Sequence, residues 1–240
     1  VRARAAALLL FVLGNWIGQD YFSPQAMAYF MSMTTVALIL HLAPSSGPTV
    51  RRLKTWWAGR QSLLVVGVLV TVLTTAIVLA HQLSPIMLIA LVVVLVLTGA
   101  TSLRTFLLVA LAIFVTWLSV GGYFFWGHHL DLLFGVHTEA KQSVSLATII
   151  SQNVTDRLKH GGLEFVVAVT RVAMALIFLG AAALSVLIGR KSRGIRVLGA
   201  LAIAPFLFLA TSGYGGEAVL RALFFALPFL SGLAGILLLR

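Results

Sequence analysis

Residues 163–193 read LEFVVAVTRVAMALIFLGAAALSVLIGRKSR. The run from 163 to 189 contains one glutamate and one arginine, and a basic cluster follows it directly. A bilayer core about 30 Å thick needs roughly 20 apolar helical residues, and this run exceeds that length. Its residues are apolar throughout and do not alternate as those of a membrane strand do. The stretch therefore predicts a transmembrane helix with cations at one end.

The rest of the 240-residue chain has the same character. It is 60% hydrophobic and only 10% charged, which leaves too little polar surface for a soluble globular protein. There is no cysteine, which excludes disulfides, thiolate catalysis and cysteine-ligated metals. The predicted fold class is an all-α, polytopic transmembrane helical bundle of about eight spans. The expected spans are 4–18, 25–43, 62–81, 85–101, 104–125, 163–189, 195–212 and 218–239.

Charge is sorted between the gaps that separate these runs. Alternate gaps hold every acidic residue: Asp20, Asp131, Glu139, Asp156, Glu164 and Glu217. The other gaps and both ends hold basic residues without acids: Arg2, Arg4, Arg51, Arg52, Lys54, Arg60, Arg104, Arg190, Lys191, Arg193, Arg196 and Arg240. Cytoplasmic loops of membrane proteins are enriched in Lys and Arg, so both termini are expected in the cytoplasm of a plasma-membrane protein. The net charge of +11 therefore indicates membrane orientation and not a nucleic-acid partner.

We expect a single transmembrane domain, 1–240, with one long extracytoplasmic loop at 126–162. In that loop four apolar residues recur at every fourth position: Leu146, Ile150, Val154 and Leu158. This spacing predicts an amphipathic helix on the outer surface, between spans five and six, and a partly ordered loop is the alternative.

Two arginines lie inside predicted spans, where charge usually has a partner or a task. Arg171 lies about two turns into span six, and Arg221 lies four residues after Glu217 at the start of span eight. A spacing of four puts both residues on one helical face, so Glu217 is expected either simply to neutralise Arg221 or to take part in chemistry. Under the second hypothesis Arg171 and Arg221 face an outer cavity and hold an anionic group such as a lipid phosphate.

Asp20 lies in a polar turn, Gly18–Gln25, between the first two predicted spans. It is a candidate general base towards a hydroxyl acceptor, and a cap or turn residue is the alternative. His128 and Asp131 belong to an H-H-x-D cluster that, with His81 or Asp20, could hold a divalent metal. The spacing matches no specific metal motif, and simple polar contacts in a loop are the alternative.

The polar turns of the chain resemble those of large actinobacterial multi-spanning proteins, presumptive glycosyltransferases of the membrane-embedded C-type superfamily. The stretches that carry the resemblance are NWIGQDYFSPQ (15–25), HQLSP (81–85), GHHLDLLFG (127–135), SQNVTDR (151–157), and YGGE (214–217) with Arg221 and FALPF (225–229) after it. In the larger proteins several spans and an acidic outer loop precede the Gly-Gln-Asp-Tyr turn. The resemblance therefore implies that this chain is the C-terminal part of a longer protein, whose further membrane spans or subunits would be its partners.

Such enzymes take a sugar from a polyprenyl-phosphate carrier at the outer leaflet, and a carboxylate acts as base. The resemblance thus implies a glycosyltransferase-like protein of the cell envelope whose partners are the bilayer and a polyprenyl-phosphate-linked sugar. The expected catalytic residues are Asp20 and Glu217. The expected substrate-binding residues are Tyr21, Gln25, His81, His128, Asp131, Arg157, Arg171, Tyr214 and Arg221. No cofactor is expected beyond the divalent metal left open above; the rival functions are a transporter or flippase for a lipid-linked or anionic substrate, and a non-catalytic scaffold subunit.

Overall fold

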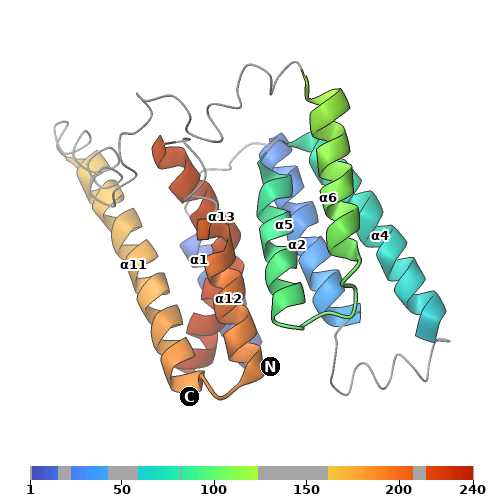
Figure 1. The fold of residues 1–240 in the computed structure, drawn as a ribbon. Helices are drawn as coiled ribbons and strands as arrows, with labels where there is room; N and C mark the ends of the chain where they lie inside the picture. Colours follow the sequence, from blue (N-terminus) through green and yellow to red (C-terminus); the bar gives the residue numbers. More distant parts are fainter. Residues whose placement is uncertain are drawn as a thin grey trace. The chain divides into compact units, whose positions relative to one another are not determined.

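The computed structural model describes residues 2–15, 23–42, 59–81, 83–123, 162–207 and 215–239. Within these ranges the chain forms eight α-helices and no strand. The helices (Figure 1) are α1 Arg2–Gly14, α2 Pro24–Leu42, α4 Gly59–Ala80, α5 Ser84–Leu97, α6 Phe106–Thr116, α11 Leu163–Gly189, α12 Arg193–Leu207 and α13 Gly215–Leu238. Each predicted apolar run therefore contains a helix. The expected amphipathic helix in 126–162 falls almost entirely outside the described residues.

Local residue chemistry explains where several helices begin and end. Ser23 caps α2, because its hydroxyl oxygen accepts a hydrogen bond from the Ala26 amide (3.1 Å), and Pro24 is the first residue of the helix. The expected span 85–101 is too long, since α5 ends at Leu97. Gly99 stops it with φ of 61°, and the Ala100 amide reaches back to the Leu95 carbonyl (2.8 Å). This is the glycine-terminated helix end that relieves unpaired carbonyls.

The other predicted boundaries differ by a few residues. The first helix begins at Arg2 and ends at Gly14, before the expected end at 18. The fifth expected span, 104–125, starts late because a turn over Leu103–Thr105 precedes α6. After Thr116 the helix widens into a π-helical turn, Trp117–Gly121, in which the Gly122 amide donates to the Trp117 carbonyl (2.6 Å).

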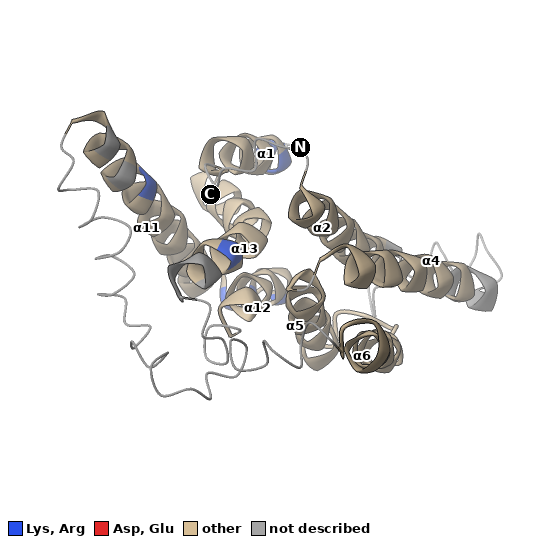
Figure 2. Ribbon diagram, turned by 90° about the horizontal axis from the view of Figure 1, so that it is seen from above, with Lys and Arg blue, Asp and Glu red and all other residues tan. Residues whose placement is uncertain are grey.

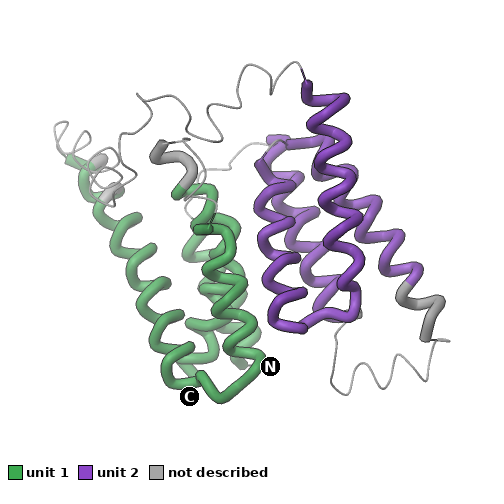
Figure 3. The backbone as a smooth tube through the Cα atoms, viewed as in Figure 1, with its two compact units in different colours: residues 1–18, 129–240 green, residues 19–128 purple. Residues whose placement is uncertain are grey.

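The described helices belong to two compact units (Figure 3): unit 1 comprises residues 1–18 and 129–240, and unit 2 comprises residues 19–128. In unit 1, α13 is the central helix and packs against α1, α11 and α12. Two-thirds of the apolar stretch of α13 is buried (67%), compared with 22% for α11, which lies at the edge of the unit. The sequence prediction of one transmembrane domain for 1–240 is not tested by this division and stays a prediction.

Small residues bring the helices of unit 1 close together. A Cβ atom placed on Gly235 of α13 would lie 2.9 Å from the backbone nitrogen of Ala7 and 3.0 Å from the carbonyl oxygen of Ala3, both in α1. Nearer the other end of α1, Gly14 lies against the ring of Phe178 (α11) and against Leu227 (α13). The two contacts show that α1 and α13 are antiparallel. Glycine and alanine at such crossings allow close backbone approach, as in membrane helix pairs.

Unit 2 contains α2, α4, α5 and α6, packed as α2 on α4 and α5, and α6 on α4 and α5. Its hydroxyl side chains are mostly turned back to their own helix. Ser32, Thr35 and Thr74 each donate to the carbonyl four residues earlier, at 2.7–2.8 Å. This pairing removes the cost of burying a hydroxyl group in an apolar environment.

Both units carry apolar side chains on their outer faces. On α4 of unit 2, Leu64, Val65, Val68 and Val72 are 60–65% exposed, and on α11 of unit 1, Leu176, Ile177 and Leu187 are 63–69% exposed. Two helical segments, Phe165–Gly189 and Val219–Leu238, are long and apolar enough to cross a membrane, judged by length and composition over the described residues. The apolar segments Leu64–Ala80, Ser84–Leu97 and Phe106–Gly121 are shorter.

Candidate functional site

Arg171 and Arg221 lie on neighbouring helices of unit 1, since α11 packs against α13. Each is the single Lys or Arg in its helix, and they account for the blue segments on α11 and α13 in Figure 2. Both helices run in the same direction and begin at the same end of the unit (Figure 1). Arg171 is eight residues into α11 and Arg221 six residues into α13, depths of about 12 Å and about 9 Å.

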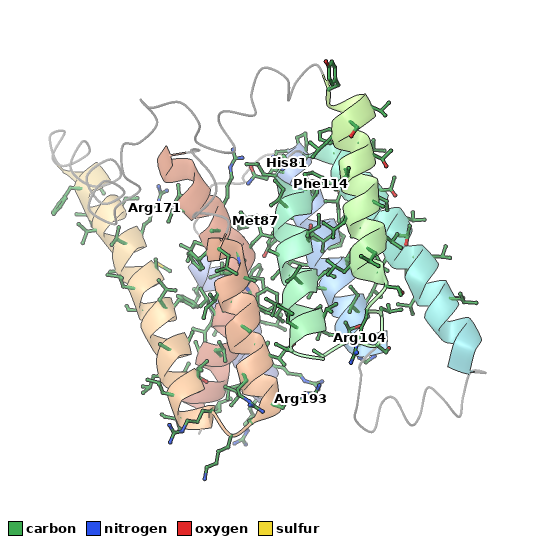
Figure 4. The ribbon with its side chains drawn as sticks, viewed as in Figure 1. His81, Met87, Arg104, Phe114, Arg171 and Arg193 are labelled. Atoms are coloured by element: carbon green, nitrogen blue, oxygen red, sulfur yellow. The ribbon has the colours of Figure 1, made fainter. Side chains whose placement is uncertain are left out.

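Both arginine side chains are half-buried. Figure 4 shows Arg171 near the end of unit 1 opposite Arg193. Arg171 and Arg221 therefore share one end of unit 1 and a similar depth, and their role in binding stays a prediction. A guanidinium group donates N–H bonds in a planar arrangement that suits the oxygens of a phosphate or carboxylate.

The helix ends at this site carry the acidic residues expected from the sequence. Glu217 lies in the first turn of α13 and Glu164 in the first turn of α11, where the helix dipole favours a carboxylate. Because α13 is a continuous helix from Gly215, Glu217 and Arg221 share one helical face. Their ion pair stays a prediction, because the Glu217 side chain lies outside the described part of the structure.

His81 joins two helices of unit 2. The Ser84 amide donates to its Nδ1 atom (3.2 Å), and the Ser84 hydroxyl oxygen lies 2.9 Å from the same nitrogen. A backbone N–H can only donate, so Nδ1 is an acceptor and the proton of the neutral ring lies on Nε2. Leu83 occupies the N-cap position of α5, and its side chain has no atom that can accept a hydrogen bond from a backbone amide. His81 therefore supplies the cap that α5 would otherwise lack.

The substrate-binding role predicted for His81 is not tested by this contact, and its partner Ser84 was not predicted. The signal was present in HQLSP, where a histidine precedes by three residues a serine and proline at a helix start. Gln25 lies in the first turn of α2 and is half-buried. Figure 1 shows that the start of α2 and the start of α5 lie at the same end of unit 2, so Gln25 and His81 share that end.

The remaining predicted site residues fall outside the described ranges: Asp20, Tyr21, His128, Asp131, Arg157 and Tyr214. The base, the metal cluster and part of the acceptor surface therefore stay predictions. Over the residues that the structure describes, no group of three or more His, Cys, Asp or Glu is placed to hold a metal ion.

Comparison of the chain with protein families, with curated proteins and with solved structures finds no match in any of the three. The site must therefore be interpreted from its own residues.

Proposed function

We propose that the chain is an integral membrane protein that binds a lipid-linked phosphate through Arg171 and Arg221 and takes part in transfer of the attached sugar. The membrane location is supported by the outward apolar faces of α4 and α11. In water such faces would form large apolar patches, which soluble monomers rarely carry, whereas lipid tails cover them without cost. Two segments of sufficient length and hydropathy, Phe165–Gly189 and Val219–Leu238, add to this argument.

The observation that carries the proposal is the placement of one arginine in each of these two segments, at one end of the same unit. An arginine inside an apolar helix is costly, so it is usually kept for a partner or a task. Here the two arginines lie on helices that pack together and start at the same end. A phosphate with its lipid tail in the bilayer matches both the charge and the apolar surroundings.

In the proposed reaction the bond between the anomeric carbon of the sugar and the phosphate oxygen breaks. The phosphate leaves on its lipid carrier, and Arg171 and Arg221 stabilise the negative charge that develops on it. A hydroxyl oxygen of the acceptor forms the new bond to the anomeric carbon. Its proton passes to a carboxylate, for which Asp20 and Glu217 are the candidates.

The proposal is tested with the protein reconstituted in lipid and a photoreactive polyprenyl phosphate as probe. Arg171→Gln and Arg221→Gln should each reduce labelling about 10- to 100-fold, because a hydrogen bond to a charged group contributes about 1.5–3 kcal/mol. Arg171→Lys should fall between, since lysine keeps the charge and loses the two-pronged geometry. Arg104→Gln is the matched control, because Arg104 is an exposed arginine in unit 2.

Sugar transfer is then measured with a polyprenyl-phosphate-linked sugar. Loss of both labelling and transfer in the Arg171 and Arg221 variants supports the enzyme. Movement of the intact lipid-linked sugar between leaflets, without loss of the sugar, would instead identify a transporter. Normal labelling in both variants would remove the two arginines from the site and favour the scaffold function.

A further inference from the structure

A second cationic surface lies at the opposite end of unit 1, where α11 turns into α12. We define the basic corner as Arg190, Lys191, Arg193 and Arg196, all of them exposed. The turn is tight, since the Ser192 amide donates to the Gly189 carbonyl (2.8 Å) and the Arg196 amide to the Ser192 carbonyl (3.2 Å). Four cations are thereby held within seven consecutive residues on rigid helix ends. Figure 4 shows Arg193 at this end of α12.

Among the described helices around the basic corner, none carries an Asp or Glu at this end of unit 1. The sequence has no Asp or Glu anywhere between Glu164 and Glu217, and both of those residues lie at the other end of the unit. The neighbouring helix ends at this end belong to α1 and α13 (Figure 1). α1 contributes Arg2 and Arg4, and the chain after Glu217 contains no acid. Every charged side chain of these described helix ends is therefore a cation.

The basic corner also borders an apolar surface. On the last turns of α11, Leu184, Leu187 and Ile188 are 48%, 69% and 57% exposed, directly before Arg190. Cations at the edge of a lipid-facing helix surface meet headgroup phosphates, while the acyl chains cover the apolar side chains beside them. An acidic protein segment would match the charge and leave that apolar surface uncovered.

We propose that the basic corner binds the phosphate groups of anionic glycerophospholipids, such as phosphatidylglycerol, in the leaflet at that end of unit 1. This inference requires the membrane location proposed above, and it is independent of the sugar-transfer chemistry. A contrast within the chain supports it: Arg104, at the connection between α5 and α6, is also exposed, and no other Lys or Arg lies within 36 residues of it in the sequence. A single exposed cation suits the role of orienting a helix pair, whereas four adjacent cations can bind several lipid phosphates at once.

The test uses the whole chain in nanodiscs that contain equal amounts of phosphatidylglycerol and phosphatidylcholine. Lipids retained by the protein are counted by native mass spectrometry. The wild type should retain phosphatidylglycerol in clear preference. Because each cation near an anionic surface contributes about fivefold, Lys191→Gln with Arg193→Gln should weaken that preference about 25-fold. Arg104→Gln should leave it unchanged.

The double variant keeps Arg190 and Arg196, so that positive charge still favours the same orientation of the chain in the membrane. A reporter fused to the chain verifies that this membrane orientation is unchanged. If the double variant is misfolded, Lys191→Gln alone, with an expected fivefold effect, replaces it. Equal retention of the two lipids by the wild type, or an equal loss of preference in Arg104→Gln, overturns the inference. A protein that fails to enter nanodiscs at all would instead overturn the membrane location itself, so the two failures are distinguishable.

Discussion

Replacing Gly235 by alanine probes how closely α1 approaches α13. The new methyl carbon would lie 2.9 Å from the backbone nitrogen of Ala7 and 3.0 Å from the carbonyl oxygen of Ala3. Ordinary contact begins at 3.4 Å, so the two helices would have to separate by about 0.5 Å at this crossing. Backbone atoms cannot rotate away as the tip of a side chain can, and the whole of α1 must move.

Two effects of opposite sign decide the size of the change. Overpacking a tight contact costs about 1–3 kcal/mol. Alanine is a better helix former than glycine and contributes up to about 1 kcal/mol in return. Gly232→Ala separates the two effects, because Gly232 lies in the same helix and a Cβ atom there meets nothing within 4 Å. We therefore expect Gly235→Ala to be less stable than Gly232→Ala by about 1–3 kcal/mol.

The difference is measured by unfolding the detergent-solubilised protein with a graded addition of sodium dodecyl sulfate and comparing the free energies of unfolding. Gly235→Leu should displace α1 completely and leave unit 2 unaffected, since α1 and α13 both belong to unit 1. Equal stability of Gly235→Ala and Gly232→Ala would refute the close backbone contact between α1 and α13.

Two further substitutions test polar groups in the helices. His81→Ala should destabilise the protein by about 1 kcal/mol because the Ser84 amide loses its acceptor, and His81→Asn should restore part of the loss. Thermal melting of the two variants measures this difference. Equal melting temperatures for His81→Ala and His81→Asn would refute the capping role. Ser231→Ala should be neutral or stabilising by up to about 1 kcal/mol, since the buried Ser231 hydroxyl has no hydrogen-bond partner among the described residues. Ser32→Ala should destabilise the protein, because Ser32 donates to the Ala28 carbonyl at 2.7 Å. If detergent unfolding gave the reverse order of stability, the hydrogen-bonding states of the two serines would be wrong.

The helix positions follow from the sequence because burial in an apolar environment requires long uninterrupted apolar runs. Where the ends were mispredicted, a single local feature decided them, as Gly99 does at the end of α5. The residues after Leu97 are small and uncharged (Thr98, Gly99, Ala100 and Thr101), so the absence of charge extends past the point where the backbone turns. Apolar content predicts a helix well and its last turn poorly.

The partners of each helix could not be predicted in the same way. The apolar segment of α13 has a lower mean hydropathy (1.9) than that of α11 (2.5), yet α13 lies at the centre of unit 1. The feature that selects it is the placement of Gly235 opposite Ala3 and Ala7, which are distant in the sequence. Small residues are common in all of these helices, so composition does not show which of them meet.

The placement of Arg171 and Arg221 could be predicted from the sequence for a different reason. Charge within an apolar run is rare, so Arg171 and Arg221 stand out, and the alternation of the runs implies that their helices start at one end. The role of His81 was less accessible. A histidine in a polar turn has no sequence pattern that reveals a capping role, and the bond from the Ser84 amide exists only once the turn is formed; the substrate-binding role of His81 stays a prediction.

The packing of α1 on α13 also has a consequence for biogenesis. About 200 residues separate the end of α1 from the start of α13, and the whole of unit 2 lies between them in the chain. At typical translation speeds of 5–20 residues per second, α1 waits about 10–40 s after its own synthesis for its principal neighbour. During that interval the surface of α1 that contains Ala3 and Ala7 is not covered by α13, so an insertase or chaperone that shields this surface would raise the yield of assembled protein.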